Sequence, residues 1–260
     1  MTASDPQFEI RLARSEEDLI SAQRLRYAVF VAELGGDGPL VDHQAGLEKD
    51  TYDPYYDHLV LIDHRRATAP PDHVVGVYRL KLSGQGDKLG RFYSEDEYDL
   101  AALHQSGRKL LELGRSCLHR DYRGGTAMYH LWNGLGEYVL KHGVEVLFGV
   151  ASFHGTDIAA IKEPLSYLHH HHLAPQELRV RAQEAHFQTM DLMPGELVDR
   201  RRAMFATPAL IKAYLRMGGF VGEGAYIDRD FNTTDVFLLM DTARMNPRQR
   251  ALYVGGRRGG

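Results

Sequence analysis

The spacing of apolar residues changes several times along the chain, and each change marks an expected element. Residues 8–12 alternate apolar and polar side chains like a half-buried strand, and Ser15 followed by three acidic residues is typical of a helix start. Two further stretches, 58–63 and 73–82, predict a strand hairpin, and residues 109–118 predict another strand. The first half of the chain therefore combines strands with at least one helix.

The clearest helical pattern covers residues 126–142, where apolar side chains recur at helical spacing. Gly143 follows at the position that glycine favours after a helix, and residues 144–153 are nearly all apolar, as in a strand buried on both faces. Helices over 157–172 and 208–217 and two closing strands complete the pattern. Strands that alternate with helices in this way predict an α/β protein with a mixed sheet and helices on both faces.

Length and the final residues determine the expected domain organisation. A chain of 260 residues is near the upper limit for one hydrophobic core. We expect a single domain over residues 1–245 and a disordered tail over residues 246–260, because the tail lacks an apolar pattern.

Composition narrows the class of protein. A formal net charge of −4 argues against a nucleic-acid-binding protein, since such proteins neutralise phosphates with excess basic residues. Cys117 is the single cysteine, so no internal disulfide forms and a reducing, cytoplasmic setting is expected. The start of the chain has no signal-peptide pattern, and no apolar run approaches the roughly 18 residues of a membrane span. Any contact with the inner membrane is therefore expected to be peripheral.

The most informative segment is a strand that runs into a glycine-containing turn and then a helix. The strand ends near Leu118, and small residues follow from Gly124 to Ala127. Backbone N–H groups at such a turn, together with the positive end of a helix dipole, favour a phosphate or phosphopantetheine arm. A tight turn without a ligand explains the same residues. Dinucleotide-binding, P-loop and serine-hydrolase patterns are absent from the sequence.

This turn resembles the acyl-donor loop of the GCN5-related N-acyltransferases (GNAT). The matching residues are Arg120-Asp121-Tyr122-Arg123-Gly124-Gly125, and the chain departs from the family pattern at Thr126, where a further glycine is usual. The resemblance implies a GNAT-like mixed, mostly antiparallel sheet flanked by helices on both faces. It also implies an acyl donor at the turn.

A second set of residues resembles the acyl-homoserine-lactone synthases, which take acyl groups from acyl carrier protein. The set comprises Arg26 and Phe30, then Glu48, Asp50 and Asp53, then Arg79, then Glu112 and Arg115. The tryptophan that those synthases place after the phenylalanine is absent, since Leu34 lies in that region.

The C-terminal part, from Leu165 to Pro175 and from Pro208 to Val236, is similar to bacterial ornithine–acyl carrier protein N-acyltransferases. That resemblance implies transfer of a 3-hydroxyacyl group from the phosphopantetheine thioester of acyl carrier protein to the α-amine of ornithine, giving lyso-ornithine lipid, with no tightly bound cofactor. The alternatives are the same reaction on glutamine, an acyl-homoserine-lactone synthase, and a catalytically silent module that binds an acyl carrier.

Two residues are the candidates for catalysis. We expect Glu112 to accept the amine proton and Arg115 to hold a carboxylate or to orient Glu112. Residues three apart in a regular strand point to opposite faces, so we expect a bulge at Gly114 to bring the two side chains together. A structural ion pair on the sheet is the alternative. Cys117 is expected to be a packing residue and not an acyl carrier.

The other candidate site residues fall into two groups. The expected acyl-donor-binding residues are Ser116, Leu118, Arg123, Gly124, Gly125, Thr126 and Ala127. The expected amino-acid-binding residues are Arg26, Asp50, Asp53 and Arg79, since carboxylates can face ammonium groups and arginine a carboxylate.

The histidine run His169–His172 predicts no metal site, because only His169 and His172 share a helix face and no third ligand follows at a suggestive spacing. Basic groups at residues 65–66, 200–202 and 257–258 are candidates for docking an acidic carrier protein or an anionic lipid surface, and solvated surface is the alternative.

Overall fold

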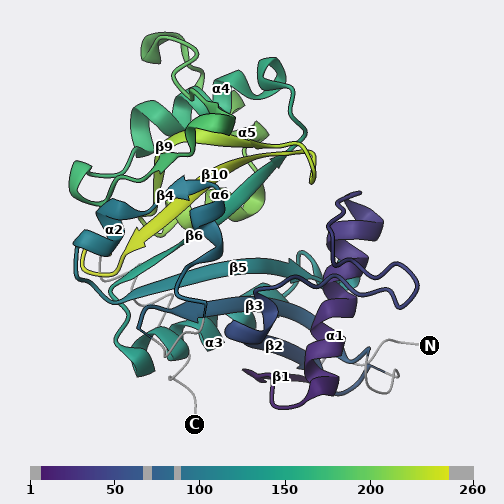
Figure 1. The fold of residues 1–260 in the computed structure, drawn as a ribbon. Helices are drawn as coiled ribbons and strands as arrows, with labels where there is room; N and C mark the ends of the chain where they lie inside the picture. Colours follow the sequence, from purple (N-terminus) through teal and green to yellow (C-terminus); the bar gives the residue numbers. More distant parts are fainter. Residues whose placement is uncertain (1–6, 67–71, 85–88, 246–260) are drawn as a thin grey trace. The chain divides into compact units, whose positions relative to one another are not determined.

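A computed structural model describes residues 7–66, 72–84 and 89–245. Their contacts divide the chain into two compact units (Figure 1). The first unit comprises residues 7–66, 72–81 and 113–143, and the second comprises the remaining described residues. The predicted tail over residues 246–260 lies outside the described residues, and the single domain over residues 1–245 stays a prediction.

The first unit is a small antiparallel sheet with a helix on each face. Its elements in chain order are β1 (Phe8–Leu12), α1 (Glu16–Arg26), a π-helix (Tyr27–Glu33), a 3-10 helix (Asp53–Tyr55), β2 (Asp57–Asp63), β3 (Val74–Leu82), β5 (Leu110–Leu118), a second 3-10 helix (Arg120–Tyr122) and α3 (Ala127–His142). Strand β2 pairs antiparallel with both β1 and β3. Strand β5 contributes to this unit from Leu113 onward, and its first residues belong to the second unit.

Neighbouring residues of β2 contact different helices because side chains of a strand alternate between its two faces. Val60 belongs to a buried cluster with Ala22 of α1. On the opposite face, a Cβ built on Gly76 would lie 2.8 Å from Leu131 of α3 and 3.3 Å from the Cβ of Leu61. Only glycine therefore lets α3 approach β3 this closely, and α1 and α3 lie on the two faces of the strands (Figure 1).

The ends of these two helices follow from local sequence signals. The Ser15 hydroxyl accepts a hydrogen bond from the Asp18 amide at the start of α1, as the sequence predicts. Helix α3 ends at Gly143, whose φ of 60° lies in the left-handed region that glycine adopts readily.

The second unit is built around paired long strands and several short elements. Its elements in chain order are a 3-10 helix (Tyr93–Asp96), β4 (Tyr98–Asp99), α2 (Ala101–Gln105), β6 (Val146–His154), α4 (Ile158–His172), a 3-10 helix (Gln176–Leu178), β7 (Arg181–Ala182), a 3-10 helix (Glu184–His186), β8 (Phe187–Gln188), a 3-10 helix (Gly195–Leu197), α5 (Arg200–Ala206), α6 (Ala209–Arg216), β9 (Phe220–Asp228) and β10 (Thr233–Asp241). Strand β10 pairs antiparallel with both β6 and β9.

A single stretch of β5 pairs parallel with β6, at Leu110–Glu112 against Val146–Phe148. The core of this unit is aromatic: the rings of Phe148 and Phe237 stack with centroids 5.5 Å apart, and the buried Tyr98 hydroxyl donates to the Asp235 carbonyl oxygen.

These pairings confirm the predicted mixed, mostly antiparallel sheet with helices. The predicted hairpin, the strand at 109–118, the helix at 126–142 and the closing strands are all present within a few residues of their expected bounds. Among the described residues, no helix combines the length and the apolar character that crossing a bilayer requires.

Candidate active site

Three arginines and three carboxylates form a cluster inside the first unit. The cluster comprises Arg26 at the end of α1, Glu48 and Asp50 in the following loop, Asp53 in the first 3-10 helix, Arg79 in β3 and Arg115 in β5. Five of the six were predicted as site residues from the sequence, and Glu48 was singled out only as part of the family pattern. We refer to these six side chains as the charge cluster.

Each arginine bridges two carboxylates, so that the members form a closed network. Arg26 donates through Nε to Glu48 and through Nη1 to Asp53, at 2.7 Å from Oδ1. Arg79 Nη1 lies 2.6 Å from Asp50 Oδ2 and 2.9 Å from Asp53 Oδ1. Arg115 closes the network, with Nε 3.1 Å from Glu48 and Nη2 3.2 Å from Asp50.

Burial and charge balance explain why the members stay ionised. Burial alone would raise the pKa of each carboxyl, but the adjoining arginines outweigh it, so the pKa of Glu48, of Asp50 and of Asp53 lies below its ordinary value. Three positive and three negative side chains leave the cluster with no net charge, as a buried ionic group requires.

Solvent reaches the cluster unevenly. The side chains of Arg26 and Arg79 are 0% and 1% exposed, whereas those of Asp50 and Arg115 are 20% and 15% exposed. Asp50 and Arg115 therefore form the accessible edge of the cluster. The buried members hold this edge in place through the ion pairs of Arg79 with Asp50 and of Glu48 with Arg115.

Local backbone structure holds the accessible edge in place. Asp50 Oδ1 accepts hydrogen bonds from the backbone amides of Tyr52 and Asp53, at 2.9 and 3.1 Å. Arg115 has a φ of 47°, in the left-handed region that a residue with a side chain rarely adopts. The sequence predicted an irregularity at Gly114, and the positive φ falls on Arg115 itself. Such strain is typical of residues held in a functional position.

Two supporting residues were missed by the sequence reasoning. Gln23 donates to Asp53 Oδ2 at 2.9 Å, and His58 Nε2 lies 3.1 Å from the Asp53 carbonyl oxygen. Burial lowers the pKa of His58, which favours its neutral form beside the arginines. Gln23 lies one helical turn before Arg26, so helical spacing was the signal that could have identified it.

Glu112 lies in the part of β5 that belongs to the second unit. Its side chain is buried, and its carboxylate accepts hydrogen bonds from the backbone amides of Tyr93 at 3.0 Å and Ser94 at 2.6 Å. These two bonds fix the carboxylate at the start of a 3-10 helix. The proposed proton-accepting role of Glu112 stays a prediction.

The predicted donor-binding segment runs from the end of β5 into α3, all within the first unit. The buried Ser116 hydroxyl oxygen has no hydrogen-bond partner among the described residues. Gly124, with a φ of 79°, and Gly125 and Thr126 are exposed, and Thr126 makes no side-chain cap to α3. The turn that leads into α3 is therefore exposed and consists of small residues, which is an arrangement suited to an anion at a helix start.

Arg123 makes contacts that the sequence did not predict. Its guanidinium bonds both carboxylate oxygens of Glu33, at 2.5 and 2.9 Å, and its Nε donates to the Leu118 carbonyl oxygen. Arg123 thus ties the π-helix to the turn, and its role toward an acyl donor stays a prediction.

Cys117 lies in the buried cluster beneath α1. Burial raises the pKa of its thiol to about 12, so the thiol is neutral at physiological pH. This setting agrees with the predicted packing role.

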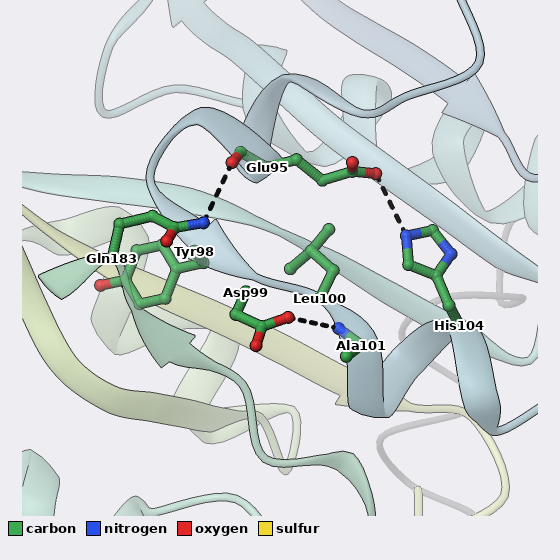
Figure 2. Close-up of a pocket in the computed structure, with 7 residues that line it drawn as sticks. All are labelled: Glu95, Tyr98, Asp99, Leu100, Ala101, His104 and Gln183. Carbon is green, nitrogen blue, oxygen red and sulfur yellow. Dashed lines mark hydrogen bonds and ion pairs between the residues drawn. The ribbon is translucent and has the colours of Figure 1, made fainter.

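The second unit also contains a surface pocket of about 240 Å³ (Figure 2). Glu95 Oε1 lies 3.1 Å from His104 Nε2, Gln183 donates to the Glu95 carbonyl oxygen, and Asp99 accepts from the Ala101 amide. None of the predicted site residues lines this pocket. Its polar side chains are engaged with one another or with nearby backbone groups, so it offers no arrangement for acyl transfer.

Comparisons with known proteins identify relatives over almost the whole chain. A family model described as an acetyltransferase (GNAT) domain matches residues 25–133. An L-ornithine N(alpha)-acyltransferase from Rhodobacter capsulatus is 60% identical, and the match covers 98% of this chain and 97% of that protein. The L-ornithine N(alpha)-acyltransferase from Brucella abortus is 41% identical, with 94% and 88% covered.

Solved structures with a similar fold include acyl-homoserine-lactone synthases. The synthase LasI is 14% identical, with 98% of each chain covered and a TM-score of 0.52. The CoA-dependent synthase BjaI, solved with SAM and isopentyl-CoA, is 14% identical, with 97% of this chain and 92% of that chain covered and a TM-score of 0.54. These two likenesses concern the fold.

Proposed function

Because the chain belongs to the family of L-ornithine N(alpha)-acyltransferases, we propose that it transfers a 3-hydroxyacyl group from acyl carrier protein to the α-amine of ornithine. The product would be lyso-ornithine lipid. The observation that carries the proposal is the 60% identity to an acyltransferase of that name over 98% of the chain. The same family membership makes the chain an acyltransferase.

The proposed reaction is direct aminolysis of a thioester. The amine nitrogen forms a bond to the acyl carbonyl carbon, the carbon–sulfur bond breaks, and the carrier leaves as its free thiol after receiving a proton. Positioning of the two reactants supplies much of the rate in such a reaction, and no protein nucleophile is required. The neutral, buried thiol of Cys117 supports a route without an acyl-cysteine intermediate.

The acyl donor is proposed to lie along β5 and the turn that follows. The unpartnered Ser116 hydroxyl and the backbone of Leu118 would bind the pantetheine chain. The phosphate would lie against the turn that leads into α3, at Gly124–Ala127, where the first three residues are exposed, with Arg123 beside it. These contacts need no tightly bound cofactor, because the thioester arrives on the carrier protein as a substrate.

The amino acid is proposed to dock on the accessible edge of the charge cluster. Asp50 would face an ammonium group and Arg115 a carboxylate, while Arg26, Asp53 and Arg79 hold the edge in place. With its α-amine deprotonated for attack, ornithine carries one carboxylate and one distal ammonium, so it adds no net charge to a balanced cluster. Glutamine in its reactive form would add a negative charge, which makes it the second candidate.

Glu112 is proposed to accept the amine proton, directly or through water. Its two bonds to backbone amides would hold the carboxylate in one orientation during the transfer. The Glu112→Gln variant keeps the shape of the side chain and removes the base, so turnover should fall. Unchanged turnover across the pH range would remove Glu112 from this role.

We further propose a cytoplasmic setting with peripheral contact to the inner membrane. Phe205 of α5 is 90% exposed, and the three exposed arginines at residues 200–202 precede it, which is a combination typical of a helix at an anionic lipid surface. Basic residues 65–66 are candidates for docking the acidic carrier protein, and residues 257–258 lie outside the described residues. A rise of the KM for acyl carrier protein with salt is expected if docking is electrostatic.

One experiment tests the reaction and its acceptor together. Purified protein is incubated with 3-hydroxyacyl carrier protein and either ornithine or glutamine, and products are weighed by mass spectrometry while free carrier thiol is measured. Release of thiol with acylated ornithine supports the proposal. If glutamine alone is acylated, glutamine is the acceptor. If neither amino acid causes release of thiol, the protein is a catalytically silent module that binds the acyl carrier.

A variant pair tests the acceptor site. Asp50→Asn should raise the KM for ornithine while leaving the KM for the acyl carrier nearly unchanged. Asp42→Asn, an exposed carboxylate in the same loop, is the matched control and should change neither constant.

A further inference from the structure

The second unit brings together three side chains that the proposed reaction does not use. His169 and His170 lie in the last turn of α4, and Asp191 lies in the loop that leads toward α5. One ligand atom from each lies within 4.8 Å of the other two. The histidine run offered no third ligand at a recognisable spacing, because Asp191 follows after a stretch with no regular pattern.

The distances in this group are close to those of ligands that share a metal ion, and His169 would have to approach Asp191 by a few tenths of an ångström. His170 Nε2 lies 3.3 Å from Asp191 Oδ1, and His169 Nε2 lies 3.9 Å from Oδ2, so each imidazole faces a different oxygen. Ligands bound to a tetrahedral ion at about 2.0–2.2 Å lie roughly 3.3–3.6 Å apart. The longer separation exceeds a hydrogen bond, so direct bonding to His169 does not explain the arrangement.

The loop is held against α4 in a way that fixes the third ligand. The Leu192 amide donates to the Ser166 hydroxyl at 3.1 Å, and the Asp191 amide donates to the Thr189 hydroxyl at 3.1 Å. A Cβ built on Gly195 would lie 3.4 Å from the His170 ring, so glycine leaves room for this imidazole. Hydrogen bonds from the Asp191 and Leu192 amides therefore fix the backbone that carries the Asp191 carboxylate.

We propose that His169, His170 and Asp191 bind a divalent transition-metal ion of the Zn²⁺, Co²⁺ or Ni²⁺ type. Imidazole nitrogens with one carboxylate suit these ions, whereas Mg²⁺ and Ca²⁺ prefer oxygen ligands alone. The Met193 carbonyl oxygen accepts a hydrogen bond from His170 Nε2 at 2.8 Å, a bond that the metal ion would replace, and water completes the shell. The ion would join the end of α4 to the loop before α5.

Protons compete for this site. An imidazole binds a metal ion only in its neutral form, so protonation and metal binding exclude one another. The other acidic, basic and histidine side chains of α4 and of the loop over residues 189–199 are Lys162, Glu163, His171, His172, Glu196 and Asp199. Glu163 is already engaged by Arg202 and the Asp199 amide.

The neighbouring histidines provide a matched control. His171 and His172 pack against Tyr167 with tilted rings, at centroid distances of 4.8 and 5.5 Å, and are not members of the group around Asp191. A run of histidines that bound metal unspecifically would use all four residues alike. At the proposed site, loss of His169 should weaken metal binding and loss of His171 should not.

The test uses the full chain without an added histidine tag, stripped of metal with EDTA. Zn²⁺ binding is measured by calorimetry, and Co²⁺ binding by its visible absorption. One equivalent should bind, Asp191→Asn and His169→Gln should each weaken binding at least tenfold, and His171→Gln should change it less than twofold. Bound Zn²⁺ should also slow proteolysis within residues 189–199.

Three outcomes would overturn the site: no saturable binding, unchanged affinity in Asp191→Asn, or equal losses in His171→Gln and His169→Gln. Circular dichroism of each variant checks that the fold is retained. We expect it to be retained because the substituted residues are exposed or half-buried. Acyl transfer by the stripped protein is a separate measurement, so failure of the metal site leaves the proposed reaction untouched.

Discussion

Asp53 is the member of the charge cluster whose removal should cost most. Its Oδ1 accepts from Arg26 at 2.7 Å and from Arg79 at 2.9 Å, and its Oδ2 accepts from Gln23 at 2.9 Å. The Asp53→Asn substitution keeps the size of the side chain but removes its charge. The three guanidinium groups of the cluster then share its two remaining carboxylates, so the cluster acquires a net positive charge.

The magnitude follows from these contacts. Each ion pair contributes about 4 kcal/mol at the effective dielectric of a protein, so two pairs lose about 8 kcal/mol of attraction. Relief from desolvating one carboxylate, together with the hydrogen bonds that the amide oxygen still accepts, offsets roughly half. The expected loss is about 3–5 kcal/mol in the free energy of unfolding, within the range for breaking a buried pair. For a slope near 3 kcal/mol per M, the urea midpoint should fall by at least about 1 M.

Urea unfolding followed by circular dichroism measures the loss, with Glu33→Gln as the matched control. Glu33 also forms a bidentate bond with an arginine, Arg123, but both side chains are about 40% exposed. Because solvent screens this exposed pair, Glu33→Gln should lower the free energy of unfolding by about 1 kcal/mol or less. If Asp53→Asn destabilises the protein no more than Glu33→Gln, burial does not strengthen the ion pairs of the cluster and the reasoning is refuted.

Three further outcomes follow from single residues. Cys117→Ala should retain acyl transfer, and the native thiol should resist iodoacetamide at pH 8, because burial raises the pKa of Cys117 to about 12. Gly124→Ala should lower the unfolding free energy by about 1 kcal/mol, since φ is 79° there, whereas Gly125→Ala should not. The Arg11 guanidinium lowers the pKa of Asp18 to about 2, so the melting-temperature gap between wild type and Asp18→Asn should be largest above pH 5 and should close as the pH falls from about 4 to 2.

Regular elements were predictable because their signals are local. The helix at 126–142 combines helical spacing with Gly143, and the hairpin strands are two mainly apolar runs separated by a polar turn that contains prolines, so each element is specified by neighbouring residues. The π-helix after Arg26 has no comparable signal, since its residues continue the apolar spacing of α1.

The site was predictable only in part because its contacts are distant in sequence. Arg115 reaches Glu48 across 67 positions, and Arg123 reaches Glu33 across 90. Spacing cannot show which arginine meets which carboxylate. The family resemblance named all six members of the charge cluster, together with Phe30 and Glu112, which lie outside it. The Arg123–Glu33 pair and the approach of Asp191 to the histidine run depend on how loops fold back.

Charge balance in the cluster also determines which variants inform on catalysis. A change at Arg26, Asp53 or Arg79 leaves a buried charge unmatched, so any loss of activity will be mixed with loss of stability. Asp50 and Arg115 reach solvent, and water can compensate part of a missing partner there. Variants of Asp50 and Arg115 should therefore change the KM for the amino acid more than the free energy of unfolding. At this accessible edge, a substrate that carries one ammonium and one carboxylate can replace the Asp50–Arg115 ion pair with its own ion pairs to these two side chains.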